Sequence, residues 1–437
     1  MVFEYLVKKR LFGISAELKY PTSDFALAQD AQKDDRSLAT IGNPAIYGAR
    51  PSSATANIMK IAYVTTYDAS DIKNWSGLGY FILKALEQQS IEIIQIGSLQ
   101  TYTNNLMKAK SYFYKYITCK NYHIDREPRV LHSYAAQVAR RLKSHNVDAV
   151  FSPGTIPICY LECSKPIVFW TDATYAGMTN FYPAWSNLCG ESVRHGNRME
   201  QAALTRCRLA IYTSDWAAKT AQDNYSVDAS KVKVVPFGAN IERERKVDDI
   251  KRIIAKRPKD ICKLLFIGVD WYRKGGDIAV EIAESLNQEG LRTELTIVGC
   301  HPPGSGPEFV NVKGYVSKNS KEGQSVLDDL LEQSHFLLLP SRADCVPVVI
   351  PEANSFGMPV VTSNVGGIPT VVRPGVNGAM LRLENFVQEA CNFIRNTMKD
   401  SDLYNRVAID SFGQYENKLN WKVAGSRIKE LLEEMRV

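Results

Sequence analysis

The sequence contains few of the features that mark membrane, secreted or nucleic-acid-binding proteins. No apolar run approaches the roughly 18–20 residues of a membrane-spanning helix, and no apolar signal-peptide core follows Met1. The net charge of +6 is modest for 437 residues. No basic run interleaved with aromatic residues, and no zinc-finger pattern, indicates nucleic-acid binding. We therefore expect a cytoplasmic protein that binds no nucleic acid, with peripheral membrane contact left open.

Cysteine pairs in metal-site or redox spacing are also missing. The nine cysteines are an odd number, and no CxxC pair occurs among them. Cys159 and Cys163 lack neighbouring histidines that would complete a zinc site. No cluster of acids has metal-site spacing either. These absences predict buried free thiols in a reducing compartment, with no metal ligands and no cofactor.

The first 58 residues differ from the rest of the chain. They are polar, contain many Ala, Ser, Gly and Pro residues, and show no sustained periodicity. The segment after Met59 reads as the first buried strand of an α/β domain. Residues 1–58 are therefore expected to be a disordered extension or a stretch upstream of a true start at Met59; both alternatives stay open here.

From Met59 onward, short apolar segments alternate with amphipathic ones, as in parallel α/β sheets. The strands expected in a first series are 60–65, 91–96, 148–152, 166–170, 208–212 and 232–235. Those of a second series are 262–267, 293–298, 309–313, 335–339, 358–362 and 378–382. The helices expected between them are 77–89, 130–145, 191–206, 215–224, 275–289, 321–333, 350–356 and 384–397. Two such series predict two Rossmann-like domains facing a cleft, with ligands at the carboxyl ends of the strands.

One candidate anion site lies in residues 263–286. An apolar strand ends at Gly268, a short loop carries Arg273 and Lys274, and two glycines open the next helix. Two cations beside a helix N-terminus suit a diphosphate. The alternative is a solvated basic turn before a surface helix.

A candidate hydroxyl-binding site lies in residues 337–372. Asp344 follows a buried strand, and seven residues separate it from Glu352, which lies in the first turn of a helix after Pro351. Two carboxylates on one side of a sheet suit the paired hydroxyls of a ribose or hexose. In the alternative, Glu352 only complements the helix dipole and Asp344 only begins a turn.

This stretch resembles the nucleotide-binding half of the retaining glycosyltransferases of family 4, the bacterial type of glycosyl transferases group 1. The resemblance is carried by PSRAD, CVPVVIP, EANSFGMPVV and GGIPT within 340–370. It implies a GT-B fold in which Glu352 holds the donor ribose, Asp344 contacts the transferred sugar and Lys274 neutralises the diphosphate. The other expected donor contacts are Arg273, Val348, Val349, Gly77, Gly79, Tyr315 and Gly366.

Three positions depart from the family pattern. Asp344 stands in place of a glutamate, Pro347 in place of a glycine, and Val269 in place of an arginine. Arg273 is expected to supply the charge that Val269 lacks.

The N-terminal half adds weaker signals. Gly77 and Gly79 precede a helix after the first strand and allow close backbone approach. Asp172, with Thr174 and Tyr175 close behind, follows another strand and resembles an acceptor-side loop of the family. We expect Asp172 to orient a sugar hydroxyl; the alternative is an Asx turn. His195 reads as a polar residue on a helix face rather than a catalyst.

The resemblance implies an acceptor-binding domain at 59–236, a donor-binding domain at 237–414 and a helix at 415–437 that returns to the first domain. It implies metal-independent hexose transfer, with retention, from a UDP- or GDP-sugar to a glycan, lipid-linked or small-molecule acceptor. The basic, aromatic segment 108–130 could meet an anionic membrane or be a solvated face. Two rivals are a non-catalytic nucleotide-sugar-binding subunit and an epimerase. The epimerase would need an acid–base pair beyond His195 and Asp172.

Overall fold

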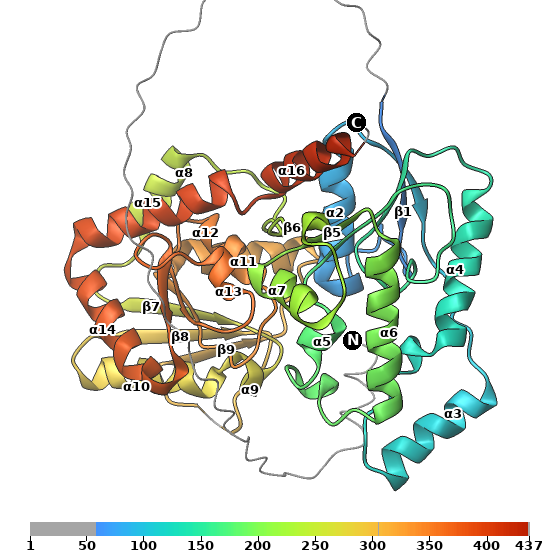
Figure 1. The fold of residues 1–437 in the computed structure, drawn as a ribbon. Coiled ribbons are helices and arrows are strands. Elements are labelled where there is room, and N and C mark those ends of the chain that lie inside the picture. The colour runs from blue at the N-terminus through green and yellow to red at the C-terminus, as the bar shows by residue number, and fades with distance from the viewer. Residues whose placement is uncertain (1–57, 305, 436–437) are drawn as a thin grey trace, which may run out of the picture. The chain divides into compact units, whose positions relative to one another are not determined.

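The structure, a computed structural model, describes residues 58–304 and 306–435 (Figure 1). Residues 1–57 lie outside this range. The two alternatives for residues 1–58, a disordered extension or a stretch upstream of the true start, therefore stay untested. No helix in the described range is long and apolar enough to span a bilayer. All nine cysteines fall within it as free thiols; seven are buried, whereas Cys119 and Cys163 are exposed, against the prediction of burial.

Short apolar segments of the N-terminal half form a six-stranded parallel sheet in the order β2-β1-β3-β4-β5-β6. Its strands are β1 (Lys60–Val64), β2 (Glu92–Ile96), β3 (Ala149–Ser152), β4 (Ile167–Thr171), β5 (Leu209–Tyr212) and β6 (Val232–Val234). Ile61 and Tyr63 enter the core on one face, and Ala62 and Val64 enter the core on the other. Burial on both faces explains why the central strands read as continuous apolar runs.

The C-terminal half repeats this arrangement with the order β12-β11-β10-β7-β8-β9. Its strands are β7 (Cys262–Ile267), β8 (Thr293–Val298), β9 (Val310–Gly314), β10 (Phe336–Leu339), β11 (Val360–Ser363) and β12 (Gly378–Leu381). The chain leaves β7 toward β8 and β9 on one side, then returns to β10 on the other. Such a reversal of strand order is where open α/β sheets bind ligands.

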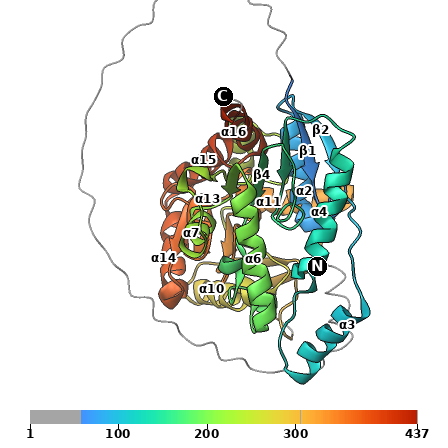
Figure 2. The ribbon, with the colours of Figure 1, turned by 45° about the vertical axis from the view of Figure 1, so that its right-hand side comes forward.

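Helices flank both sheets (Figure 2). The N-terminal half carries α2 (Leu78–Glu87), α3 (Asn105–Tyr112), α4 (Pro128–Leu142), α5 (Tyr175–Met178), α6 (Gly190–Arg206) and α7 (Asp215–Asn224). The C-terminal half carries α8 (Val247–Lys256), α9 (Trp271–Lys274), α10 (Gly276–Gln288), α11 (Lys321–Gln333), α12 (Val349–Asn354), α13 (Ile368–Val371), α14 (Phe386–Lys399) and α15 (Ser401–Asn417).

The last helix, α16 (Trp421–Glu434), crosses to the N-terminal half and packs on α2 (Figure 1). Its Trp421, Ile428, Leu431 and Leu432 belong to the core that also holds Phe237. The expected return of the closing helix is therefore confirmed. Asn420 caps α16 by accepting a hydrogen bond from the Val423 amide, as short polar residues do at helix starts.

The twelve expected strands and the eight expected connecting helices are all present, and the strand ends shift by at most two residues. The two Rossmann-like sheets are thus confirmed. Longer helices that the sequence did not predict are α3, α8 and α15. The domain boundaries stay predictions.

Candidate functional site

The strongest candidate site lies where β7 and β10 flank the reversal in strand order. After β7, Asp270 caps α9 by accepting a hydrogen bond from the Arg273 amide at 3.0 Å. Gly275 then adopts φ 78°, and a Cβ there would lie 2.1 Å from the Pro340 carbonyl oxygen. Glycine is required at this point because the two strand-end loops touch. The contact brings Lys274 to the loop that carries Asp344.

Lys274 and Asp344 form a largely buried ion pair. The Lys274 ammonium donates to Asp344 Oδ2, and Ser341 Oγ donates to the same oxygen at 3.2 Å. Burial lowers the pKa of Lys274, and the Asp344 charge opposes that shift. Each residue therefore neutralises the other at the carboxyl end of the sheet.

Arg273 lies next to this pair and reaches the N-terminal half. Its Nη1 donates to the Ala343 carbonyl at 2.9 Å and lies 3.9 Å from Asp344 Oδ2. The guanidinium stacks over the ring of Tyr182, 4.5 Å from its centroid, and the Tyr182 hydroxyl accepts a hydrogen bond from the Cys345 amide at 3.0 Å. Tyr182 therefore links the segment after β4 to the loop that carries Asp344.

Asp172 faces the same region from the end of β4. Burial raises the pKa of Asp172 to about 6, and the negative charge of Asp344 adds to the shift. The Asp172 charge in turn helps burial to raise the pKa of Tyr67, which follows β1. The Tyr67 hydroxyl is buried and has no hydrogen-bond partner in the described chain. Asp172, Asp344 and Tyr67 are therefore electrostatically coupled although they come from three strand ends.

The two residues named with Asp172 have local roles. Thr174 caps α5 through the Gly177 amide and bonds to Thr220. Tyr175 is buried and donates to the Ser192 carbonyl at 2.8 Å. Both therefore position the loop after β4.

Glu352 lies in α12 with 3% of its surface exposed. Lys318, in the loop between β9 and α11, donates to both of its carboxylate oxygens at 2.6 Å. Tyr315 begins that loop and is 71% exposed. Val348, which precedes α12, packs against the core of the N-terminal half, and Val349 packs against that of the C-terminal half.

The expected glycines have packing roles that the structure makes explicit. Gly366 has φ 53°, and a Cβ there would lie 2.0 Å from the Asp344 carbonyl oxygen. Gly77 has φ 84° and begins α2. Gly79 has no room for a Cβ because the Tyr67 ring lies against it. Gly366 thus sets the position of the Asp344 backbone, and Gly79 sets that of Tyr67.

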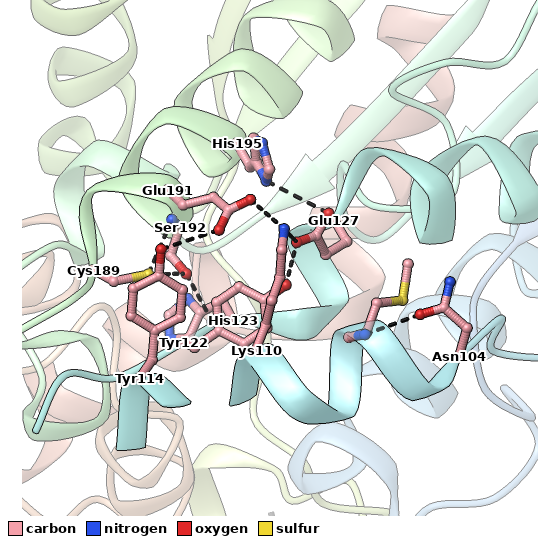
Figure 3. A network of polar contacts seen from close by, with 11 residues as sticks. Asn104, Lys110, Tyr114, Tyr122, His123, Glu127, Cys189, Glu191, Ser192 and His195 are labelled. Atoms are coloured by element: carbon pink, nitrogen blue, oxygen red, sulfur yellow. Dashed lines mark hydrogen bonds and ion pairs between the residues drawn. The ribbon is translucent and has the colours of Figure 1, made fainter. Parts of the chain in front are cut away.

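His195 belongs to a different network, beneath α3 (Figure 3). Its Nδ1 lies 3.9 Å from Glu127 Oε2, and with Glu127 and Glu191 it forms a group that could hold a metal by residue type. However, the Lys110 ammonium bonds to both carboxylates, at 3.2 and 2.5 Å, and so takes the cation's place. His195 therefore lies beside the ion pairs that anchor α3, in a network separate from that of Asp172.

Lys318, Tyr67 and Tyr182 were not singled out from the sequence. Tyr67 directly follows the first strand and Tyr182 lies in the predicted acceptor loop, so strand-end position was an available signal for both. Lys318 carries no such signal, because its partner Glu352 is 34 residues away.

Two family descriptions match the chain in sequence. "Glycosyl transferases group 1" matches residues 262–400, and "Glycosyltransferase Family 4" matches residues 83–243. A D-inositol 3-phosphate glycosyltransferase of Streptomyces scabiei is 30% identical over 190 residues, which cover 40% of this chain and 42% of that relative. The lipopolysaccharide glucosyltransferase WaaG of Escherichia coli is 26% identical over 284 residues, covering 62% and 73%. The chain thus spans less than half the length of the inositol phosphate relative.

Solved structures share the fold. A sucrose-phosphate synthase of Thermosynechococcus elongatus aligns with TM-score 0.60 and 15% identity, over 86% of this chain and 99% of that one. Anabaena HepE, solved with UDP and glucose, aligns with TM-score 0.56 and 16% identity, over 86% and 99%. The architecture is GT-B, as predicted.

Proposed function

The chain belongs to the family 4, group 1 glycosyltransferases, and from this premise we propose that it moves a hexose from a UDP- or GDP-sugar to an acceptor hydroxyl. The acceptor would be a glycan, a lipid-linked sugar or a small molecule. The observation that carries the proposal is the Lys274–Asp344 pair at the reversal in strand order, which faces Asp172 of the other half. A UDP-sugar is favoured by the UDP and glucose found in the neighbour HepE.

In the proposed reaction, the bond between the sugar's anomeric carbon and the diphosphate breaks as the acceptor oxygen bonds to the same face of that carbon. Because the new bond forms on the face that the diphosphate leaves, configuration is retained, and the acceptor proton passes to the departing phosphate oxygen. Lys274 and Arg273 would stabilise the leaving diphosphate, an electrostatic role. Asp344 would orient the transferred sugar and Asp172 the acceptor, and neither carboxylate would act as a nucleophile.

A donor panel tests this proposal. We expect one nucleotide sugar to raise the melting temperature in a concentration-dependent way, since a ligand that binds only the folded state stabilises it. Free nucleotide should then be released only with acceptor present, and NMR should show an unchanged anomeric configuration. Release of a new nucleotide sugar without acceptor would instead indicate an epimerase, and binding without any turnover would indicate a binding subunit.

We further propose that transfer needs no metal and no cofactor, because Arg273 and Lys274 offer two positive charges for the diphosphate. The chelator EDTA should leave the rate unchanged within about twofold. A loss of activity that Mg²⁺ or Mn²⁺ restores would refute this part of the proposal.

The α3 segment supports peripheral membrane contact as a finer proposal. Its polar side faces the protein: Lys110 bonds to Glu127 and Glu191, and the Tyr114 hydroxyl donates to Glu191 at 3.2 Å (Figure 3). Met107 is buried in the core, but most of the other apolar side chains face outward. The exposed ones, in α3 and the following π-helical turn, are Leu106, Tyr112, Phe113, Tyr116 and Ile117, each more than half exposed.

The charge of this segment favours an anionic surface. Between Glu92 and Asp125 the chain carries four lysines and no acid. Outward aromatics with flanking lysines are typical of segments that lie in the membrane interface. We therefore place an anionic bilayer, where a lipid-linked acceptor would reside, against the apolar side of α3.

Vesicle co-sedimentation tests this contact. The protein should bind phosphatidylglycerol vesicles, bind phosphatidylcholine vesicles weakly, and lose affinity as salt rises. The double variant Phe113→Ser with Ile117→Ser should abolish binding. The control Val326→Ser, at an exposed position of α11, should not. Equal vesicle binding by both variants would rule out the α3 surface as the membrane contact.

A further inference from the structure

Glu352 is a buried acid whose carboxylate is paired with the Lys318 ammonium. The carboxylate lies in the first turn of α12 and is nearly inaccessible to solvent, whereas the Lys318 side chain is 38% exposed. The ammonium is equidistant from the two carboxylate oxygens, at 2.6 Å. A carboxylate has about four lone-pair positions, so this contact leaves each oxygen free to accept one more hydrogen bond.

Burial of an acid without a partner favours its neutral form. The pKa of Glu352 is raised by burial and lowered by the Lys318 charge. Within the described chain, Lys318 is the only charged group that shifts it. Two arginines lie near the other end of α12, but Arg245 bonds to Asp328, and Arg257 bonds to the Phe356 and Gly357 carbonyls and the Tyr404 hydroxyl.

The loop that carries Lys318 is held in place. The Lys318 carbonyl accepts a hydrogen bond from the Gln324 side chain of α11 at 2.9 Å, and Ser320 caps α11 through the Gly323 amide. These hydrogen bonds fix the loop backbone in a position from which the Lys318 side chain contacts Glu352.

We propose that Lys318 is a positioning residue for the donor: its ammonium keeps the buried Glu352 carboxylate ionised and oriented, so that the two remaining lone pairs accept the ribose hydroxyls. This inference rests on the proposed donor site, and it assigns a role to a residue outside the family motif. Lys318 acts through Glu352 and contacts no reacting atom.

The test compares a nucleoside diphosphate with its 2′,3′-dideoxy counterpart. The probe is UDP, or GDP if the wild-type protein binds that better. The wild-type protein should bind the ribose form about 10- to 100-fold more tightly at pH 7, because hydrogen bonds to a charged group are strong. Lys318→Met should reduce this ratio to below about threefold at pH 7. The ratio should recover as the pH rises, because a higher pH favours ionisation of the buried Glu352 carboxyl in the absence of the lysine.

Two variants and one control distinguish an effect of the Lys318 charge on Glu352 from a general effect of removing a lysine. Lys318→Arg should restore the wild-type ratio and pH profile, since a guanidinium also bonds both carboxylate oxygens. Glu352→Gln should show the low ratio at every pH. The control Lys321→Met removes an exposed lysine at the start of α11 and should change nothing.

The outcomes are distinct. An unchanged ratio and pH profile in Lys318→Met would refute the proposal, and so would a higher ratio, which would make Lys318 a competitor of the ribose. Should the wild-type protein bind neither diphosphate, the donor site itself would be refuted. Circular dichroism of each variant identifies loss of fold, in which case Lys318→Gln takes the place of the methionine variant.

Discussion

At the residue scale, Asp344 shows how the chain departs from its family. The carboxylate is one methylene shorter than the family's glutamate, yet it still meets the Lys274 ammonium and the Ser341 hydroxyl. Gly366 and Gly367 pack tightly against the backbone of Asp344 and Cys345 and so fix the position from which the shorter side chain extends. The fold therefore accommodates the aspartate.

The first prediction concerns this carboxylate. Asp344→Asn should lower kcat by about 100-fold or more, the usual effect of losing one preorganised electrostatic contact. Nucleotide binding should persist, because Lys274 is then released for the diphosphate. Steady-state kinetics and calorimetric titration with UDP or GDP measure the two effects. The control Asp260→Asn breaks an exposed ion pair with Arg292 before the start of β7, at the end of the strand opposite the reversal, and should keep its kcat. Normal turnover in Asp344→Asn would defeat the assigned role.

The second prediction concerns Asp172 and pH. Because its pKa is raised to about 6 by burial and the Asp344 charge, the folded protein keeps this proton at pH values where the unfolded chain has lost it. Ionisation therefore lowers the free energy of unfolding as pH rises from about 4 to 6. Asp172→Asn should be more stable than wild type by about 1–2 kcal/mol at pH 7.5, since one pKa unit is worth about 1.4 kcal/mol. The two should match at pH 4.

Urea denaturation at both pH values measures this effect, and a transfer assay should show lower activity in the same variant. The exposed Asp223→Asn, on α7, serves as the control and should shift stability by less than about 0.5 kcal/mol. Equal stability of Asp172→Asn and wild type at pH 7.5 would show that the Asp172 carboxylate carries no burial penalty.

Asp172 directly follows β4, and Asp344 and Lys274 lie in the segments that follow β10 and β7. A two-residue error in a strand does not change the edge of the sheet at which such residues lie. Their roles in the site stay predictions. Lys318 could not be found in this way because its contact depends on how the β9–α11 loop lies over α12. Gly366 and Gly79 were predicted as ligand contacts, but their close packing against Asp344 and Tyr67 is visible only in three dimensions.

At the element scale, the loop between β1 and α2 is unusual. Trp75, Ser76 and Gly77 adopt positive φ angles of 45°, 55° and 84° in succession. Left-handed non-glycine residues need support from their surroundings. Asn240 supplies it: its side-chain amide donates to the Ser76 carbonyl at 3.1 Å, and its Oδ1 accepts from Trp421 Nε1 at 3.1 Å. One side chain thus joins the loop, the inter-half connection and α16.

The third prediction follows from this connection. Asn240→Ala should lower the free energy of unfolding by about 1–3 kcal/mol, because it leaves the buried indole N–H without a partner. It should also raise KM for the donor, since the loop loses its support. Trp421→Phe removes only one of the two bonds and should leave KM nearly unchanged. A double-mutant cycle on the free energy of unfolding measures the Asn240–Trp421 coupling, and an unchanged KM in Asn240→Ala would show that the loop does not depend on Asn240.

The unpredicted helices have physical reasons of their own. In α3 only Met107 is buried, whereas the apolar Leu106 and Tyr112 and the polar Asn105 and Lys108 are all exposed, so the helix lacks the apolar stripe that identifies a surface helix. Neither α8 nor α15 was among the helices expected from the sequence. Their helical form depends on packing, since α15 contacts α8, α12 and α14.

At the scale of the described chain, the C-terminal helix makes the two halves interdependent. The core of the N-terminal half includes Trp421, Ile428, Leu431 and Leu432 of α16, so that core is completed by the last part of the chain. The preceding helix, α15, packs within the C-terminal half. We therefore expect the N-terminal half to be unable to reach full stability without α16.

Two glycine substitutions in these adjacent helices test that dependence. Gly425 of α16 lies against α2, and a Cβ there would be 2.7 Å from the Ala85 carbonyl oxygen, whereas a Cβ on Gly413 of α15 would meet nothing within 4 Å. Gly425→Ala should therefore lower the free energy of unfolding by about 1–3 kcal/mol through overpacking. Gly413→Ala should raise it by about 0.5–1 kcal/mol through helix propensity. Hydrogen exchange should locate the loss in Gly425→Ala within β1, β3 and β4, because α16 covers their core. Stabilisation by both substitutions would mean that α16 docks loosely and that the halves fold independently of it.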